Sequence, residues 1–256
     1  MRALPLRRTR TDTARLIGGS ELKMRKLVQG FMVVVFLGSA AAVLHAQDYR
    51  VFVEGGLSTL FDKRYYNVYG ASFGSTYRSG ISFTAGGEIP VLKKLSVEGS
   101  YSMFRNNLAI TNFYNSTTPN DVIGYGMRGQ RVSVDALAHP AKPIRGVRPY
   151  LVVGLDFNRF SPTSSGAALA QSPGFNGVPG TVLKPDNIFG WNFGGGLEYS
   201  LTHFLAVRID ARDHRFASPT YGLPTSANSA FTAYFPIHGV ANNIVYSAGC
   251  VFRFGL

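Results

Sequence analysis

The sequence has little cysteine and, beyond residue 46, no segment whose apolar residues recur with convincing helical spacing. Its single cysteine, Cys250, excludes an internal disulfide and a zinc site built from cysteines. Cys250 is predicted to serve as a small apolar residue. Without helical segments, the chain is expected to be all-β.

An apolar run near the amino end belongs to a leader. Within residues 24–46, a short basic region precedes a run that starts at Phe31 and continues through small residues to Leu44. This layout is typical of a secretory signal peptide, and we predict cleavage after Ala46, with Ala42 as the alternative. A membrane-spanning helix is the weaker interpretation, because the uninterrupted run is shorter than the ~20 residues that a span needs.

Residues 1–23 give this leader more basic residues than a signal peptide needs. A complete signal peptide begins at Met24, so we predict that Met24 is the true start and that residues 1–23 are a mis-called extension. The mature domain is then expected to cover residues 47–256.

The formal net charge of +12 makes nucleic acid and anionic lipid candidate partners. Beyond the leader, basic residues are adjacent only at Lys63-Arg64 and at Lys93-Lys94. A dispersed surplus favours contact with anionic lipid headgroups. No nucleic-acid partner is predicted.

Beyond the leader, apolar and polar residues alternate with a period of two in eight segments, each close to the ~9–11 residues with which a tilted strand crosses a bilayer. In the last of them Ile244, Tyr246 and Phe252 share one apolar face. In the fifth the register is ambiguous, and the face with Leu151, Val153, Leu155 and Phe157 is chosen as the apolar one. The predicted strands cover residues 49–57, 81–89, 95–103, about 127–138, 149–158, 189–199, 205–211 and 244–256.

The connections alternate between short and long. Short ones are predicted at 90–94, about 139–147 and 200–203, and long ones at about 58–80, 104–125, 159–187 and 213–242. Short turns on one side and long loops on the other are typical of a transmembrane β-barrel. The predicted fold is therefore an eight-stranded antiparallel up-and-down barrel whose last strand pairs with its first.

Several motifs make the chain similar to a known family. It resembles the small eight-stranded outer-membrane barrels, such as the transmembrane domain of OmpA and the OmpX group, over about residues 48–256. The resemblance implies the outer membrane of a Gram-negative envelope, outer-membrane lipids and the barrel-insertion machinery as partners, and no second domain for peptidoglycan binding. The resemblance rests on the motifs Gly194-Gly195-Gly196-Leu197-Glu198-Tyr199, Arg208-Ile209-Asp210 and Val251-Phe252-Arg253-Phe254.

The resemblance also implies an insertion signal at the carboxyl end. The family usually ends on an aromatic residue, whereas this chain ends on Leu256 with Phe254 two positions earlier on the same face. The predicted signal consists of Tyr246, Phe252, Phe254 and Leu256.

A soluble, lipocalin-like barrel is the alternative, because a period of two does not say which face points outward. The more polar face is rich in glycine and serine and carries few lysines, which makes a poor solvated surface. The loop alternation and the apolar face that continues to the carboxyl end also favour the membrane.

With the apolar face outside, charges of both signs point inward, where they are expected to pair because an unpaired buried charge is costly. An eight-stranded barrel is just wide enough for its side chains to fill it, so a plugged interior without a pore is predicted. A gated or narrow channel is the alternative. The predicted interior network consists of Arg50, Glu54, Glu88, Glu98, Arg131, Asp135, Glu198, Arg208, Asp210, Arg212 and Arg253.

No catalytic motif emerges from the sequence. A lipid A deacylase barrel would need a His-x-Ser pair, and no histidine here has serine two residues later. Asp213-His214 could suggest an acid–base pair, but adjacent Asp and His are common by chance. No ligand spacing indicates a metal, and no cofactor is predicted.

The expected function is that of a non-enzymatic outer-membrane barrel with a structural, envelope-integrity or surface-interaction role. Its long loops are candidate contacts for an extracellular protein or glycan. A narrow porin-like channel is the alternative, and a lipid-modifying enzyme is the third candidate.

Overall fold

The computed structural model describes residues 48–61, 63–66, 72–113, 120–165, 167, 182–223, 225 and 239–255. No helix within these ranges is long and apolar enough to cross a membrane. The predicted extension 1–23, the predicted signal peptide 24–46 and Leu256 lie outside the described residues. The strands are β1 (Asp48–Leu60), β2 (Lys63–Tyr66), β3 (Ser72–Arg78), β4 (Gly80–Leu92), β5 (Leu95–Phe113), β6 (Asn120–Ala138), β7 (Val147–Pro162), β8 (Asp186–Ser200), β9 (Leu205–Ala217) and β10 (Val240–Gly255).

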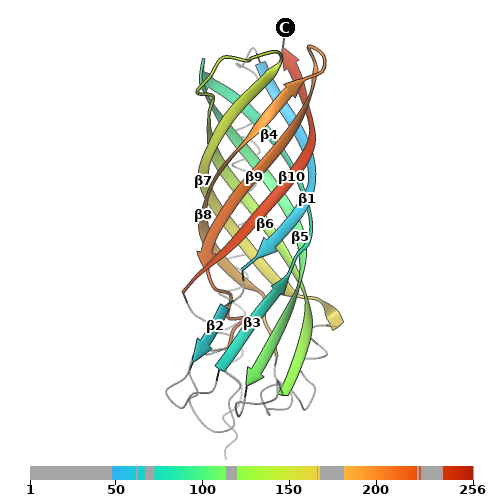
Figure 1. Cartoon of the computed structure of the whole chain (residues 1–256), viewed down its shortest axis with the longest axis vertical. Helices are drawn as coiled ribbons and strands as arrows, with labels where there is room; N and C mark the ends of the chain where they lie inside the picture. The colour runs from blue at the N-terminus through green and yellow to red at the C-terminus, as the bar shows by residue number, and fades with distance from the viewer. Residues whose placement is uncertain are drawn as a thin grey trace, which may run out of the picture. The chain divides into compact units, whose positions relative to one another are not determined.

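Eight of these strands close into an antiparallel barrel (Figure 1). The order around the wall is β1, β4, β5, β6, β7, β8, β9 and β10, which is the order of an up-and-down meander. Strand β10 then pairs with β1, with Val51 opposite Phe252 and Leu57 opposite Tyr246. The predicted fold and the predicted pairing of the last strand with the first are confirmed.

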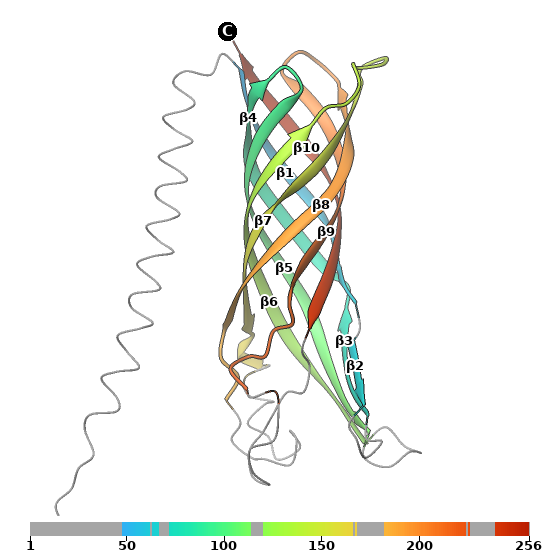
Figure 2. The same cartoon turned by 90° about the vertical axis from the view of Figure 1, so that its left-hand side faces the viewer.

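The short turns lie at one end of this barrel. They are Lys93-Lys94 between β4 and β5, residues 139–146 between β6 and β7, and residues 201–204 between β8 and β9. Figure 2 shows these turns at the end where the carboxyl terminus is marked, and the β2–β3 hairpin at the opposite end. The predicted short connections are confirmed.

The strands are longer at the loop end than the sequence predicted. The predicted loop 104–125 is wrong in large part, because β5 continues to Phe113 and β6 already begins at Asn120. The predicted loop 58–80 contains β2 and β3, and β3 pairs with the distal half of β5. Distal β5 carries polar residues on both faces, such as Asn106 and Asn107, so apolar alternation fades while backbone pairing continues.

The apolar face of the wall points outward. On β7 the exposed fraction is 71% for Leu155 and 59% for Leu151, whereas it is 4% for Val152 between them and 3% for Tyr150 just before them. The register chosen for the fifth predicted strand is therefore confirmed. Apolar side chains that face away from the interior need a lipid neighbour, because soluble monomers rarely expose large apolar surfaces.

Candidate functional site

The barrel interior contains an apolar layer near each end. Near the loop end, Phe104 of β5, Phe160 of β7 and Phe216 of β9 are buried on the inner face. The Phe160 ring centroid lies 5.8 Å from that of Phe104 and 5.1 Å from that of Phe216. Near the turn end, buried side chains form two further apolar clusters: Phe52, Ala206 and Val251 in one, and Leu137, Tyr150 and Val152 in the other.

A charged network fills the space between these layers, and Arg208 of β9 is one of its two centres. Its guanidinium nitrogens lie 2.8 Å from Glu98, 3.0 Å from Glu54 and 3.1 Å from Asp210. Arg208 Nε also donates a hydrogen bond of 2.6 Å to the Tyr150 hydroxyl, which in turn donates to Asp210. The Arg208 side chain is 1% exposed and that of Glu98 0%, so these charges depend on one another and not on water.

The same guanidinium lies between two aromatic rings. Its central carbon is 4.7 Å from the ring centroid of Phe52 and 4.7 Å from that of Tyr150. Such cation–π contacts are worth about 2 kcal/mol when they are desolvated. Arg208 therefore joins the apolar clusters at the turn end to the charged network, which lies on their loop side.

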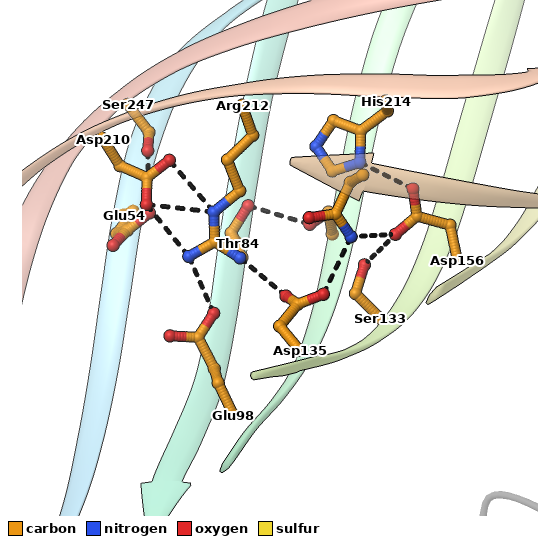
Figure 3. Close-up of polar contacts among 12 residues, drawn as sticks. Glu54, Thr84, Glu98, Ser133, Asp135, Asp156, Asp210, Arg212, His214 and Ser247 are labelled. Atoms are coloured by element: carbon orange, nitrogen blue, oxygen red, sulfur yellow. Dashed lines mark hydrogen bonds and ion pairs between the residues drawn. The ribbon is translucent and has the colours of Figure 1, made fainter. Parts of the chain in front are cut away.

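Arg212, four residues farther along β9, is the second centre (Figure 3). It reaches Asp135 at 2.7 Å, Glu98 at 2.9 Å and Asp210 at 2.9 Å. Residues of one face of a strand recur every second position, so Arg208, Asp210 and Arg212 all point inward. Glu98 and Asp210 each bridge the two arginines, which makes one connected network of them.

A hydrogen-bonded branch extends this network toward the loop end. Asn192 donates hydrogen bonds to Asp135 at 2.8 Å and to Asp156 at 2.9 Å. Asp156 also accepts from Ser133 Oγ at 2.7 Å and lies 2.7 Å from His214 Nδ1 (Figure 3). The aspartate therefore stands between the serine and the histidine.

A second group of ion pairs lies near the turn end. Arg50 is 3.2 Å from Glu88 and 3.7 Å from Glu198. Arg253 also pairs with Glu198 and donates to Ser200 Oγ at 2.8 Å. These pairs link β1 and β10 to β4 and β8 around the inner wall.

Arg131 of β6 is the exception among the predicted network residues. Within the described part of the chain it forms no ion pair, and its side chain is 2% exposed. Its Nε donates to Asn158 at 2.8 Å, and its guanidinium carbon lies 5.0 Å from the ring centroid of Phe104. It therefore contacts the loop-end apolar layer.

The model of the outer membrane protein beta-barrel domain matches residues 31–244. The chain belongs to this family. Among solved structures, OprG from Pseudomonas aeruginosa is similar with a TM-score of 0.56 and 13% identity, over 82% of this chain and 97% of OprG. An identity this low shows a shared fold only.

Two further solved structures match more loosely. Neisserial surface protein A (NspA) has a TM-score of 0.45 and 14% identity, over 82% of this chain and 98% of NspA. Ail of Yersinia pestis, in complex with the heparin analogue sucrose octasulfate, has a TM-score of 0.40 and 12% identity, over 80% of this chain and 99% of Ail. No curated protein matches the chain.

Membership of the outer membrane protein beta-barrel family places the protein in the outer membrane. Its exposed apolar face lies against outer-membrane lipid, with the short turns periplasmic and the long loops extracellular. Tyr246, Phe252 and Phe254 of the predicted insertion signal lie on this outer face, and the Phe254 ring stacks on Tyr49 at 4.9 Å between centroids. Their role as an insertion signal stays a prediction.

The interior network contains more residues than the predicted one, which consisted of charged residues only. Five of the added residues lie on the inner face of the predicted strands, so the alternation contained the signal for them. His139 lies in the turn after β6, and His214 fell in the predicted loop 213–242, into which β9 extends. Asp213 points outward to Arg215 at 2.9 Å, while His214 points inward, so the two adjacent residues do not act together. The added residues are Ser133, His139, Tyr150, Asp156, Asn158, Asn192 and His214.

One small cavity lies within the network. Its volume is about 20 Å³, and Glu54, Ser102, Arg212 and Ser247 contribute to its lining. That volume is on the scale of one water molecule, which occupies about 10–15 Å³ by this measure. Among the described residues, no group of three or more His, Cys, Asp or Glu side chains could hold a metal ion.

Proposed function

We propose that the protein is a non-enzymatic outer-membrane barrel with a solid interior and a structural, envelope-integrity or surface-interaction role. The main support is the way in which side chains fill the interior from one end to the other. An apolar layer is followed by a charged network with a water-sized cavity, and then by a second apolar layer. Ions crossing this interior would have to displace buried aromatic rings and break buried ion pairs. The surfaces left for contact with other molecules are the outer wall and the long extracellular loops.

A narrow channel is the second candidate. The observation that favours it is the polar wall of the cavity, to which β4 and β5 contribute the small hydroxyl side chains of Ser82, Thr84, Ser100 and Ser102 beside Phe104. In a switchable channel, Arg212 would hold the closed state through its ion pairs on the far side of this cavity.

Conductance separates these two functions. We expect the folded protein in planar bilayers to give no steady, reproducible single-channel steps, and we expect Arg212→Ala to stay silent because both apolar layers remain. Arg215→Ala, which changes an outward arginine, is the matched control. Steady steps from the unchanged protein, or steps that appear with Arg212→Ala but not with Arg215→Ala, would show a channel.

The non-enzymatic part of the proposal is supported by the Ser133, Asp156 and His214 contacts. In a catalytic triad the histidine stands between serine and aspartate, where it can take the serine proton. Here the aspartate stands between the other two, and Asp156 accepts the Ser133 hydrogen bond, so His214 is not placed to take the Ser133 proton.

Mass analysis of lipid A tests this part. We expect identical lipid A masses from cells with and without the protein. Loss of an acyl chain only in cells that carry the protein, and its return with His214→Gln, would assign the protein to the lipid-modifying enzymes.

A further inference from the structure

Three arginines lie close together on the outer face of neighbouring strands, which run side by side in Figure 2: Arg105 of β5, Arg128 of β6 and Arg159 of β7. Arg105 is directly opposite Arg128 in the β5–β6 register. Arg159 is opposite Gln130, which is two residues along the same face from Arg128. Directly opposite residues on one face have Cβ atoms about 4.5–5.5 Å apart, and diagonal ones about 7–8 Å.

These arginines mark the edge of the apolar belt. On β5 the preceding outward residue is Met103, which is 45% exposed, and on β7 the outward residues before Arg159 are apolar from Leu151 to Phe157. The arginines follow the belt on the loop side of each strand. They therefore lie where the hydrocarbon of the outer leaflet gives way to its headgroups.

Within the described part of the chain, none of the three forms an ion pair. Arg215, another outward arginine at this edge, differs from them, because it binds Asp213 at 2.9 Å and lies over the rings of Trp191 and Phe193. Like charges directly opposite each other on a sheet destabilise it. An anion that the protein itself does not supply would relieve this repulsion.

The chemistry of arginine specifies the anion. Its planar guanidinium binds phosphate in a bidentate manner, and its apolar stem can lie along the hydrocarbon while the head reaches the headgroup. At the edge of the outer leaflet, the phosphates available to an outward guanidinium are those of membrane lipids.

We propose that Arg105, Arg128 and Arg159 form a binding site for the phosphate groups of a phosphorylated glycolipid of the outer leaflet, of the lipid A type. The site lies on the outside of the wall, so it does not depend on whether the interior conducts. Occupied by such a lipid, it would fix one side of the barrel to the headgroup layer of the membrane.

The test measures lipid binding to the full folded protein. Native mass spectrometry of the detergent-solubilised protein, titrated with bisphosphorylated lipid A, gives the dissociation constant. Each arginine near a charged membrane surface contributes about fivefold in affinity, so we expect about fivefold weaker binding for Arg128→Gln and roughly a hundredfold for Arg105→Gln, Arg128→Gln and Arg159→Gln together. Arg215→Gln removes one outward positive charge at the same edge and is expected to bind like the unchanged protein.

Two further arms fix the identity of the ligand. Lipid A stripped of its phosphates is expected to bind the unchanged protein far more weakly, and inorganic phosphate at the same concentration is expected not to displace the phosphorylated lipid. Equal binding of both lipids, displacement by inorganic phosphate, or a triple variant that binds like the unchanged protein would overturn the proposal. If the triple variant fails to fold, the comparison of the two lipids on the unchanged protein decides.

Discussion

Replacing Arg208 with methionine is expected to lower the free energy of unfolding by about 3–5 kcal/mol, the cost of leaving a buried charge without its partner. The guanidinium is within 3.1 Å of Glu98, Glu54 and Asp210, and it also accounts for the contacts with Phe52 and Tyr150. Methionine keeps much of the length and apolar volume, so the loss measures charge and hydrogen bonding more than packing. Urea unfolding of the protein folded in lipid vesicles gives this free energy.

A double variant distinguishes coupling between Arg208 and Glu98 from two substitutions that each destabilise the barrel independently. Glu98→Gln alone should also destabilise the barrel. Combined with Arg208→Met it should recover part of the loss, because the buried carboxylates that Arg208 had balanced are then fewer by one, although Glu98 also pairs with Arg212. Arg215→Met is the matched control and is expected to cost at most about 1 kcal/mol, since its side chain is 38% exposed. If the losses of Arg208→Met and Glu98→Gln simply added, the two residues would not be coupled.

Much of this network follows from the sequence. Alternation on each strand assigns one face to lipid and the other to the interior, and this rule alone places Arg208, Asp210 and Arg212 inside. The same rule, applied to the fifth predicted strand, places Asp156 and Asn158 inside as well. What a side chain faces is thus a local property of the chain.

Which residues meet inside the barrel is not a local property. Arg208 and Glu98 are 110 residues apart in sequence, and their contact depends on the register of every strand pair between β5 and β9. Alternation gives the face of a residue but not its height along the barrel axis. The sequence therefore could not show that Arg212 pairs with three carboxylates, whereas Arg131 pairs with none among the described residues.

The sequence did not predict the loop-end parts of β5 and β6, for a related reason. Inside the bilayer every outward residue must be apolar, and this makes the period visible. Beyond the belt the sequence of β5 no longer alternates strictly between apolar and polar residues, as in Leu108-Ala109-Ile110, although its pairing with β6 continues as far as Asn112 and Asn120. The three outward arginines lie at this boundary, where the apolar period ends but the wall continues.

The second large effect tests the direction in which the wall faces. Leu155→Arg is expected to lower the free energy of unfolding in lipid vesicles by about 2–4 kcal/mol, the cost of a basic side chain at the middle of a lipid-facing wall. Leu155 is 71% exposed and lies between Val153 and Phe157 in the apolar belt of β7. On the exposed surface of a soluble barrel the same substitution would change stability by about 0.5 kcal/mol or less.

Thr59→Arg is the matched control for Leu155→Arg, because Thr59 lies on the outer face at the loop end of β1, beyond Leu57 and with Ile244 directly opposite it. Basic residues near the membrane interface cost about 0–1 kcal/mol, so this variant should unfold at nearly the same urea concentration as the unchanged protein. The difference between the two variants measures depth in the membrane and not the introduction of a charge as such. Equal stabilities for both variants would mean that the outer face of β7 does not lie in hydrocarbon, and the argument that turns the charged network inward would fail with it.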